Sequence, residues 1–369
     1  MRARRPSCAS ESRPLSTTPA DPAPARNSVM FQCSLLTRCL PTALALCLLV
    51  ACGSPQVADP PQAAERPVIA PPATPDGDAV VEPPSPGALE VSALVSADWL
   101  EAHLAHPEVL VIHIGGEEGG SASTGLIPGQ VRMAFEDIVV RDRHGIGFVL
   151  PEIAVLREAF ESAGVSDDRV VVLTGDREGL FAARGFFSLH VLGLGDRVGL
   201  LDGGLEQWVE DGRPTADAPA DAIRGSISAE PRLDLVVDAQ FVLDHLEHPG
   251  LQLLDARPPM EYRGAVSGDD VLIPGHIPGA ANVFWMDTLR AEDRPLMRSR
   301  EELEELFLGK EIDSADELIV YCRLGLMASF AFFVAEWLDR EVRVYDESYV
   351  DWTRQDDYPV VRIVPAASE

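Results

Sequence analysis

Short, mostly apolar runs recur along the chain from residue 90 onward, and longer segments of mixed polarity separate them. Four of these runs span residues 109–113, 170–173, 251–255 and 318–321. Apolar runs of this length are typical of strands in a parallel sheet that is covered on both faces. The pattern therefore predicts an α/β fold built on small parallel sheets.

The segments between these runs show helical periodicity. Residues 96–105 start at Ser96, a favourable N-cap, and place three large apolar side chains on one face. Residues 151–163 begin with a proline, which suits the first turn of a helix, and show similar apolar spacing. Residues 180–192 and 328–338 are apolar on nearly all sides. We expect these two segments to be buried helices that flank the sheets.

The body of the chain contains two copies of one pattern. Four landmarks occur in the same order in both halves, 142 to 150 positions apart. They are a strand with a polar end, a glycine-proline turn, a strand with a short glycine loop, and a tryptophan after the last strand. The paired positions are His113 and Asp255, Gly125 and Gly275, Asp176 and Cys322, and Trp208 and Trp352. We therefore predict two tandem domains of one fold.

Changes in composition mark the expected boundaries. Residues 52–89 are rich in proline and alanine, cannot bury a core, and are expected to form an extended tether. Residues 215–232 are rich in alanine, proline and aspartate and are interpreted as a linker. The predicted domains thus span residues 90–214 and 233–369.

An apolar run ends immediately before the tether. Residues 40–51 are too few to span a bilayer, but they suit the core of a signal peptide. Cys52 follows, and the pattern resembles a bacterial lipobox, in which the cysteine is lipidated. We expect residues 1–51 to be a leader, with Met30 as an alternative start, and the mature chain to be a periplasmic lipoprotein. Gly53 favours the outer membrane. The alternative is that Cys52 only ends an apolar stretch.

The chain is strongly acidic, with a formal net charge of −29 and a pI of about 4.5. Such a surface repels phosphate backbones, so we expect no nucleic-acid partner. The hydrophobic content of 46% indicates a globular body. Contact with a membrane is expected through the lipid anchor only. The oligomeric state is left open.

Cys322 is the one cysteine that follows Cys52 in the chain. It comes after an apolar strand and before a glycine loop and a helix-like stretch. Such a loop can point several N–H groups at one centre, and the helix N-terminus adds a positive dipole end. With Arg323 adjacent, we expect the pKa of Cys322 to be lowered, so that a thiolate or persulfide anion is stabilised. The alternative is a buried structural cysteine.

The second half resembles the active half of tandem-domain rhodaneses, the thiosulfate and 3-mercaptopyruvate sulfurtransferase family. The resemblance rests on Asp255-Ala256-Arg257, the turn 275–280 (GHIPGA), the Cys322 loop and Trp352, and it covers roughly residues 90–360. The first half resembles the inactive half, with Asp176 in the place of the cysteine. The resemblance implies two rhodanese-like domains, each a small parallel sheet flanked by helices.

The resemblance also implies a reaction. Cys322 would take the outer sulfur of thiosulfate, mercaptopyruvate or an organic persulfide, hold it as a persulfide, and pass it to a thiol or cyanide. No cofactor and no metal are implied. The alternative function is a non-enzymatic persulfide carrier or binding lipoprotein with the same fold.

The residues expected to bind the substrate come from the cysteine loop and from the segment after the strand at 251–255. They are Arg323, Leu324, Gly325, Leu326, Met327, Asp255, Arg257 and Arg263. Three positions depart from the family pattern. Leu324 replaces a lysine, Met327 replaces a threonine-type residue, and Glu261 stands where an arginine often binds the substrate. We therefore expect a less cationic and more apolar pocket. The donor is then expected to be a larger organic persulfide or thiosulfonate, or the activity with thiosulfate is expected to be low.

Overall fold

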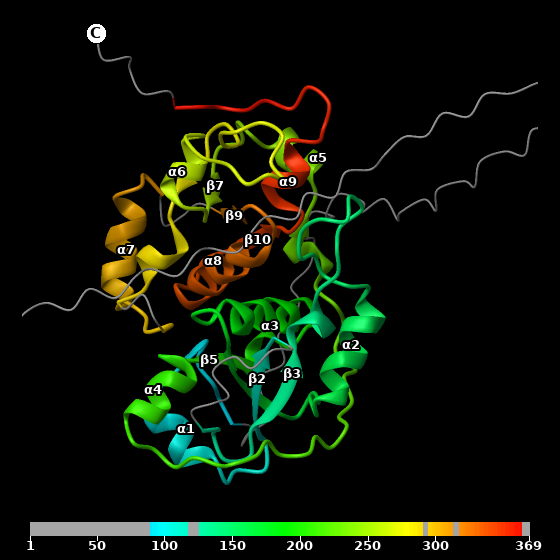
Figure 1. The fold of residues 1–369 in the computed structure, drawn as a ribbon, viewed down its shortest axis with the longest axis vertical. Helices are drawn as coiled ribbons and strands as arrows, with labels where there is room; N and C mark the ends of the chain where they lie inside the picture. Colours follow the sequence, from blue (N-terminus) through cyan, green and yellow to red (C-terminus); the bar gives the residue numbers. More distant parts are fainter. Residues whose placement is uncertain (1–88, 117–124, 291–293, 313–316, 364–369) are drawn as a thin grey trace, which may run out of the picture. The chain divides into compact units, whose positions relative to one another are not determined.

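The computed structural model describes residues 89–116, 125–290, 294–312 and 317–363. Within these residues the strands form two parallel five-stranded sheets (Figure 1). The first sheet has the order β1-β5-β4-β2-β3 and the second the order β6-β10-β9-β7-β8, which is the same topology. In chain order the strands are β1 Leu94–Val95, β2 Val109–Gly115, β3 Val131–Ala134, β4 Val170–Gly175, β5 Val198–Leu201, β6 Val236–Val237, β7 Leu251–Asp255, β8 Ala281–Asn282, β9 Glu317–Tyr321 and β10 Val342–Tyr345.

The central strands are buried on both faces. Every residue of β4 is buried, as are the last four of the five residues in β9. Continuous burial of this kind requires helices on both sides of the sheet. The predicted α/β fold with two small parallel sheets is therefore confirmed, and the repeat seen in the sequence is a repeat of topology.

Nine α-helices and four short 3-10 helices occur in the described residues. The α-helices are α1 Ala97–His103, α2 Ile153–Ser162, α3 Leu180–Val191, α4 Gly204–Glu210, α5 Ala239–Asp244, α6 Pro259–Tyr262, α7 Arg300–Leu308, α8 Leu326–Trp337 and α9 Ser348–Trp352. The 3-10 helices are η2 Phe135–Ile138, η3 Gly195–Arg197, η4 Leu233–Leu235 and η5 Trp285–Thr288.

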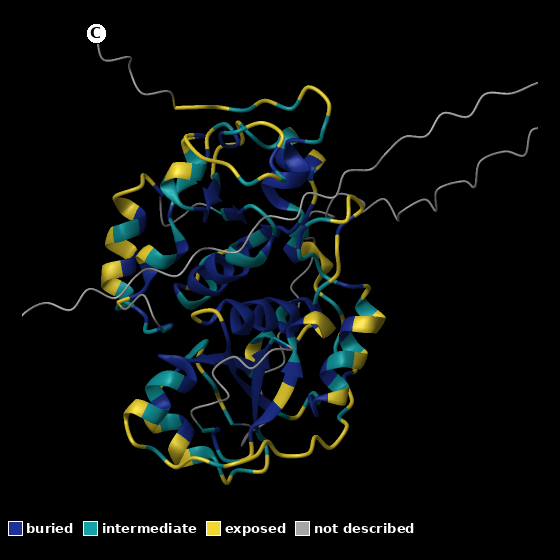
Figure 2. Cartoon of the chain, viewed as in Figure 1, coloured by how far each residue is buried: buried dark blue, intermediate teal, exposed yellow. Residues whose placement is uncertain are grey.

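The helices α3 and α8 pack against each other where the two halves meet. Eleven of the twelve residues of α3 and eight of the twelve residues of α8 are buried (Figure 2). The rings of Phe186 and Phe333 meet edge to face with centroids 5.3 Å apart, and those of Phe187 and Phe332 are 4.9 Å apart. This explains why both segments are apolar on all sides: one side faces the sheet and the other faces the partner helix.

The helix boundaries follow local rules. Ser96 caps α1 by accepting a hydrogen bond from the Trp99 N–H at 3.2 Å, as expected. α2 begins at Ile153 rather than at Pro151, because the proline precedes the N-cap Glu152. α8 begins at Leu326, two residues before the expected start, because Gly325 already forms the cap.

The two tryptophans of the repeat occupy equivalent places. Trp208 and Trp352 are fully buried, and their indole N–H groups donate to the carbonyl oxygens of Pro214 (2.8 Å) and Pro359 (3.0 Å). Each indole thus joins the helix after the last strand to the segment that leaves its half. These contacts support a core role for both side chains.

Residues 215–232 form no helix and only an isolated bridge at Ala216. Their backbone binds the first half, as in the hydrogen bonds from Ala220 to Gln130 and from Gly225 to Glu161, both 2.8 Å. The predicted leader and nearly all of the predicted tether lie outside the described residues, so they and the domain boundaries stay predictions. No helix in the described part of the chain is long and apolar enough to cross a membrane.

Candidate active site

Cys322 lies directly after β9, at the carboxyl edge of the second sheet. Its N–H donates to the Ser348 Oγ at 3.2 Å, and its carbonyl accepts from the Tyr349 N–H at 3.0 Å. Both partners belong to the start of α9, which follows the neighbouring strand β10. The sheet thus places the cysteine between two strand ends, where open α/β folds usually form their sites.

Backbone N–H groups surround the sulfur. The Gly325 N–H donates to Sγ at 3.2 Å, and the N–H groups of Leu324 and Ala328 lie near enough to favour a charged sulfur. The Ser348 hydroxyl lies 4.0 Å from the sulfur. Gly325 has φ 93°, in the left-handed region that glycine adopts at no steric cost, and this turn directs its N–H inward. The arrangement can stabilise negative charge on sulfur.

The expectation of a lowered pKa for Cys322 is wrong. The side chain is fully buried, and burial raises the pKa of the thiol above its ordinary value. The hydrogen bonds from the backbone and from Ser348 act in the opposite direction but are outweighed. Burial penalises the charged form of any group, and the sequence did not show how deeply this loop is covered.

We expect the alkylation of Cys322 to depend steeply on pH. Because the thiolate reacts and the pKa is raised, the rate should rise about tenfold per pH unit from pH 7 to pH 9. The measurement is iodoacetamide labelling of the full chain, read at the Cys322 peptide by mass spectrometry. A rate that is already constant at pH 7 would mean a lowered pKa and would contradict this result.

Arg323 does not direct its charge at the thiol. Its Nη1 lies 3.6 Å from Oε1 of Glu261 in α6, and the Glu261 side chain is 15% exposed. The carboxylate thus offsets the one cation of the loop. Glu261 therefore lowers the positive charge of the site in two ways. It stands in place of an arginine, and it offsets the charge of Arg323.

Asp255 and Arg257 form a buried ion pair beneath the loop. Arg257 donates from Nε and Nη2 to the Asp255 carboxylate at 2.6 to 3.1 Å, and from Nη2 to the Gly275 carbonyl at 2.8 Å. Its guanidinium lies 4.0 Å from the centroid of the Tyr349 ring. Both charged side chains are satisfied within the protein, so the pair supports the loop and the turn at 275–280.

The structure does not bring Arg263 to the cysteine. Its side chain is exposed, and it lines a cavity of about 440 Å³ together with Lys310 and Asn282. No residue of the cysteine loop lines that cavity. The part of Arg263 in binding the substrate therefore stays a prediction from the sequence.

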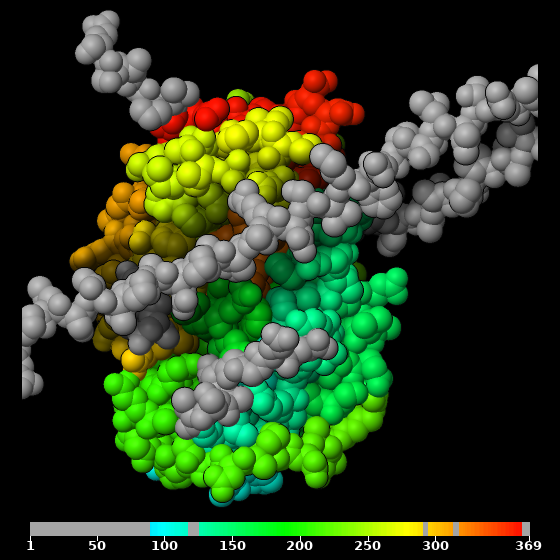
Figure 3. Space-filling view, viewed as in Figure 1, coloured from blue at the N-terminus to red at the C-terminus, as the bar shows by residue number. Residues whose placement is uncertain are grey.

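Apolar side chains cover the rest of the loop. Leu326 and Met327 pack on the main core, and Leu324 packs on the smaller core of the second half. A hairpin of the first half, residues 140–149, adds Ile146 and Phe148 to the same two cores. The first half (cyan to green) and the second half (yellow to red) are in contact on the face drawn in Figure 3. The surroundings of the thiol are thus largely uncharged.

The hairpin is also bonded directly to the loop. The Phe148 N–H donates to the Leu324 carbonyl at 2.9 Å, and Arg143 at its tip pairs with the buried Asp351 of α9. The first half therefore forms one wall of the site.

The equivalent loop of the first half has another conformation. Asp176 replaces the cysteine and accepts a hydrogen bond from the Gly116 N–H at 3.2 Å. Arg177, Glu178 and Gly179 all have positive φ values, of 55°, 52° and 83°. In the cysteine loop only Gly325 does. Three successive left-handed residues turn the chain differently, which supports the expectation that this half is catalytically silent.

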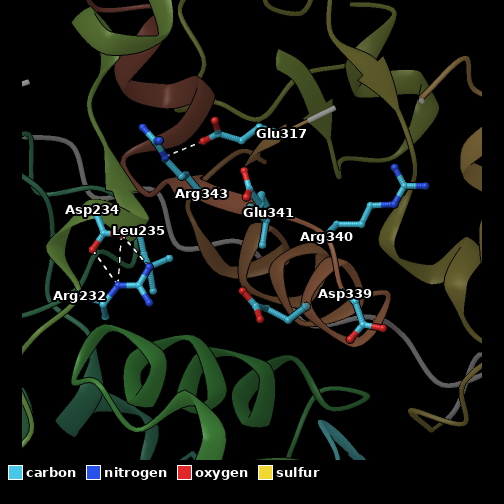
Figure 4. A pocket seen from close by; sticks show the side chains of 10 residues that line it. Arg232, Asp234, Leu235, Glu317, Asp339, Arg340, Glu341 and Arg343 are labelled. Carbon is cyan, nitrogen blue, oxygen red and sulfur yellow. Dashed lines mark hydrogen bonds and ion pairs between the residues drawn. The ribbon is translucent and has the colours of Figure 1, made fainter. Parts of the chain in front are cut away.

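A larger cavity lies away from the cysteine. It measures about 460 Å³ and is lined by the first residues of β9 and β10, the end of α8 and the linker (Figure 4). Arg343 pairs with Glu317 at 2.6 Å and Arg232 with Asp234 at 2.7 Å. These charges already compensate one another, and Cys322 lies at the opposite end of β9, so we do not assign the reaction to this cavity.

Several residues around the thiol were missed in the sequence. Ser348 has φ 60°, and its hydroxyl bonds the Cys322 N–H, but no local pattern marks it. Asp346 directly follows β10, and no local pattern marks it either. The sequence does set Arg184 apart, because it is the one charged residue between positions 180 and 189 of an apolar helix. A charged residue in a buried helix needs a partner. Among the described residues no cluster of His, Cys, Asp and Glu could hold a metal ion.

Comparisons with known proteins agree with this geometry. Residues 238–355, which contain Cys322, match the rhodanese-like domain. Over 287 residues the chain is 32% identical to the sulfur carrier protein TtuD of Thermus thermophilus, covering 73% of this chain and 96% of that protein. It is also 32% identical over 279 residues to the probable 3-mercaptopyruvate sulfurtransferase of Pseudomonas aeruginosa, covering 72% and 97%.

A solved structure supports the fold. The anaerobic ergothioneine biosynthesis enzyme from Chlorobium limicola, in complex with trimethyl histidine, matches with a TM-score of 0.65 and 25% identity. The match covers 74% of this chain and 71% of that chain. The likeness therefore spans both sheets rather than the second half alone.

Proposed function

The chain belongs to the rhodanese family of sulfurtransferases, and on that premise we propose that Cys322 carries the sulfur and that an organic persulfide is its donor. The observation that supports the role of Cys322 is the set of N–H groups from Leu324, Gly325 and Ala328 around its sulfur. Such donors stabilise the thiolate before transfer and the persulfide anion after it.

The proposed transfer is a pair of exchanges at sulfur. The Cys322 thiolate attacks the outer sulfur of R–S–SH, a new S–S bond forms, and the old one breaks as its electron pair leaves with R–S⁻. The proton stays on the transferred sulfur. An acceptor thiolate then attacks the outer sulfur of the Cys322 persulfide, and the Cys322 thiolate is restored.

The donor is inferred from the charge of the site. Arg323 is paired with Glu261, and Arg257 with Asp255, so a carboxylate already offsets the charge of both described cations. Leu324, Leu326 and Met327 present apolar surface instead. Thiosulfate would lose its hydration in this site without gaining a positively charged partner. An organic persulfide has less charge at its sulfur atoms, so it would lose less hydration free energy.

The experiment that tests this function is a comparison of donors. The chain is incubated with glutathione persulfide, mercaptopyruvate or thiosulfate, its mass is measured, and cyanide is then added. We expect a gain of one sulfur atom at Cys322, fastest with the persulfide, followed by thiocyanate release. Transfer that is fastest with thiosulfate would refute the proposed donor, and no gain from any donor would refute the function.

A carrier role is the second candidate. A relative at 32% identity is named a sulfur carrier protein, and a fully buried thiol suits a sulfur that is stored rather than turned over rapidly. The two functions differ in turnover. An enzyme releases many equivalents of thiocyanate when persulfide and cyanide are both in excess, whereas a carrier that needs a protein acceptor releases about one.

The pairing of Arg323 leads to a further prediction. Glu261→Gln should free the guanidinium to meet an anion, so kcat/KM for thiosulfate should rise by about five- to tenfold while that for the organic persulfide changes little. Steady-state kinetics with both donors measure this. The matched control is Glu261→Gln with Arg323→Met, which should lose the gain. An unchanged preference in Glu261→Gln would contradict the role given to this ion pair.

We propose that the chain is anchored by a lipid at Cys52 on the periplasmic face of a bacterial membrane. The support is the apolar run of residues 40–51 directly before the cysteine. A Cys52→Ser chain should move from the membrane fraction to the soluble fraction when both are probed by immunoblot. Continued partition of this variant with membranes would refute the anchor.

A further inference from the structure

One charged side chain of the first half lies at the base of the cysteine loop. Arg184 sits in the middle of α3 and is fully buried. It donates from Nη1 to Oδ1 of Asp346 at 2.6 Å and from Nη2 to Oδ2 at 3.1 Å. A bidentate arginine-carboxylate pair fixes both partners in distance and in orientation.

Asp346 lies against the residue that donates to the sulfur. A Cβ atom added to Gly325 would lie 2.7 Å from the Asp346 carbonyl oxygen and 3.1 Å from its Oδ1. The Gly325 N–H in turn donates to the Cys322 Sγ at 3.2 Å. If Asp346 shifts, Gly325 can shift with it, and the Gly325 N–H then no longer points at the sulfur.

A second path leads from Arg184 to the same glycine. Its Nη1 also donates to the Ser329 Oγ at 3.2 Å, and the Ser329 hydroxyl donates to the Gly325 carbonyl at 3.2 Å. The guanidinium thus contacts, through Asp346 and Ser329, groups on both sides of Gly325. Ser329 is fully buried, so water does not replace these bonds.

The equivalent place in the other half lacks this arrangement. Asp202 corresponds to Asp346, and its Oδ1 accepts from the Met297 N–H at 2.9 Å, as the Asp346 Oδ2 accepts from the Leu150 N–H at 2.7 Å. The helix residue that corresponds to Arg184 is Phe330. Burial raises the pKa of Asp202, and the nearby Arg290 opposes this without reversing it. A guanidinium that binds this aspartate is therefore found beside the cysteine loop and not at the equivalent place beside the Asp176 loop.

We infer that Arg184 is a positioning residue of the sulfur-transfer site: from the silent half it holds the Gly325 N–H towards the Cys322 sulfur through Asp346 and Ser329. The inference rests on the proposed role of Cys322. It makes the first half part of the catalytic apparatus, since the group that orders the loop lies outside the half that carries the cysteine.

The test uses variants of the full chain. Arg184→Met alone leaves a buried carboxylate without its partner and can unfold the chain, so the main variant is Arg184→Met with Asp346→Asn, which keeps the charge balanced. Circular dichroism and a melting curve first establish that each variant is folded. Cyanide-dependent sulfur release then gives kcat and donor KM, and iodoacetamide labelling gives the pH profile of Cys322.

We expect the double variant to lose about 10- to 100-fold in kcat, with donor KM changed less than twofold. The pH profile of alkylation should move to higher pH, because the thiolate loses an aligned donor. Arg184→Lys should recover part of the rate, since an ammonium can still bind Asp346. The matched control is Asp202→Asn in the silent half, which should leave kcat and the pH profile unchanged.

Two results would overturn the inference. One is a folded double variant with parental kcat and parental pH profile. The other is an Asp202→Asn chain that loses as much rate as the double variant, because the effect would then be one of general stability. If the parental chain takes up no sulfur, the proposed function fails, and the alkylation profile alone decides the role of Arg184.

Discussion

A Cys322→Ser chain should take up no sulfur from any donor, and its rate of sulfur transfer should fall by a factor of about 10⁴ or more. The serine hydroxyl has nearly the size of the thiol, so the loop can keep its fold around it. Oxygen cannot form the S–S bond that stores the transferred atom, and an alkoxide is far harder to form at neutral pH than a thiolate. The mass of the chain after donor treatment and thiocyanate release after cyanide addition measure both losses.

The duplicated fold supplies a control for this result. Asp176→Cys added to Cys322→Ser returns a thiol to the chain at the equivalent position of the silent half. We expect no recovery, because Arg177, Glu178 and Gly179 turn the loop through left-handed conformations that do not repeat the cysteine loop. Sulfur uptake at position 176 would show that the loop tolerates the chemistry and that the aspartate alone makes this half silent.

The fold could be predicted because its determinants are local in the sequence. β4 and β9 appear as continuous apolar runs, since both faces of each strand are covered. α3 and α8 are apolar all round, since each packs on a sheet and on the other helix. The boundaries that differ, at Pro151 and at Gly325, depend on cap geometry, which a periodic pattern does not contain.

The site could be predicted only in part, because its electrostatics depend on distant contacts. Cys322 and its ring of N–H groups follow from the strand, the glycine loop and the helix start. The burial that raises the pKa of Cys322 depends instead on a core to which residues far along the chain contribute, among them Phe148 of the hairpin 140–149. The contacts from Arg323 to Glu261 and from Arg184 to Asp346 join residues that are far apart in the chain. No local pattern indicates where either guanidinium points.

Gly325→Ala should be the most damaging change that leaves the thiol in place. Gly325 has φ 93°, where an alanine costs about 1–2 kcal/mol. Its Cβ would also lie 2.7 Å from the Asp346 carbonyl oxygen, a backbone atom that the Arg184 pair holds in place. The loop must therefore move, and the Gly325 N–H leaves the sulfur. We expect sulfur release to fall about 100-fold and the free energy of unfolding to fall by about 2–4 kcal/mol.

The matched control for this variant is Gly129→Ala in the silent half. Gly129 has φ 79°, and a Cβ there would meet nothing within 4 Å, so this change adds the strain of the left-handed backbone without a collision. It should lower stability by about 1 kcal/mol and leave sulfur release unchanged. Sulfur-release kinetics and urea unfolding of both variants separate the two effects. Equal activity in the two variants would mean that the Gly325 N–H, although it bonds the sulfur, does not contribute to transfer.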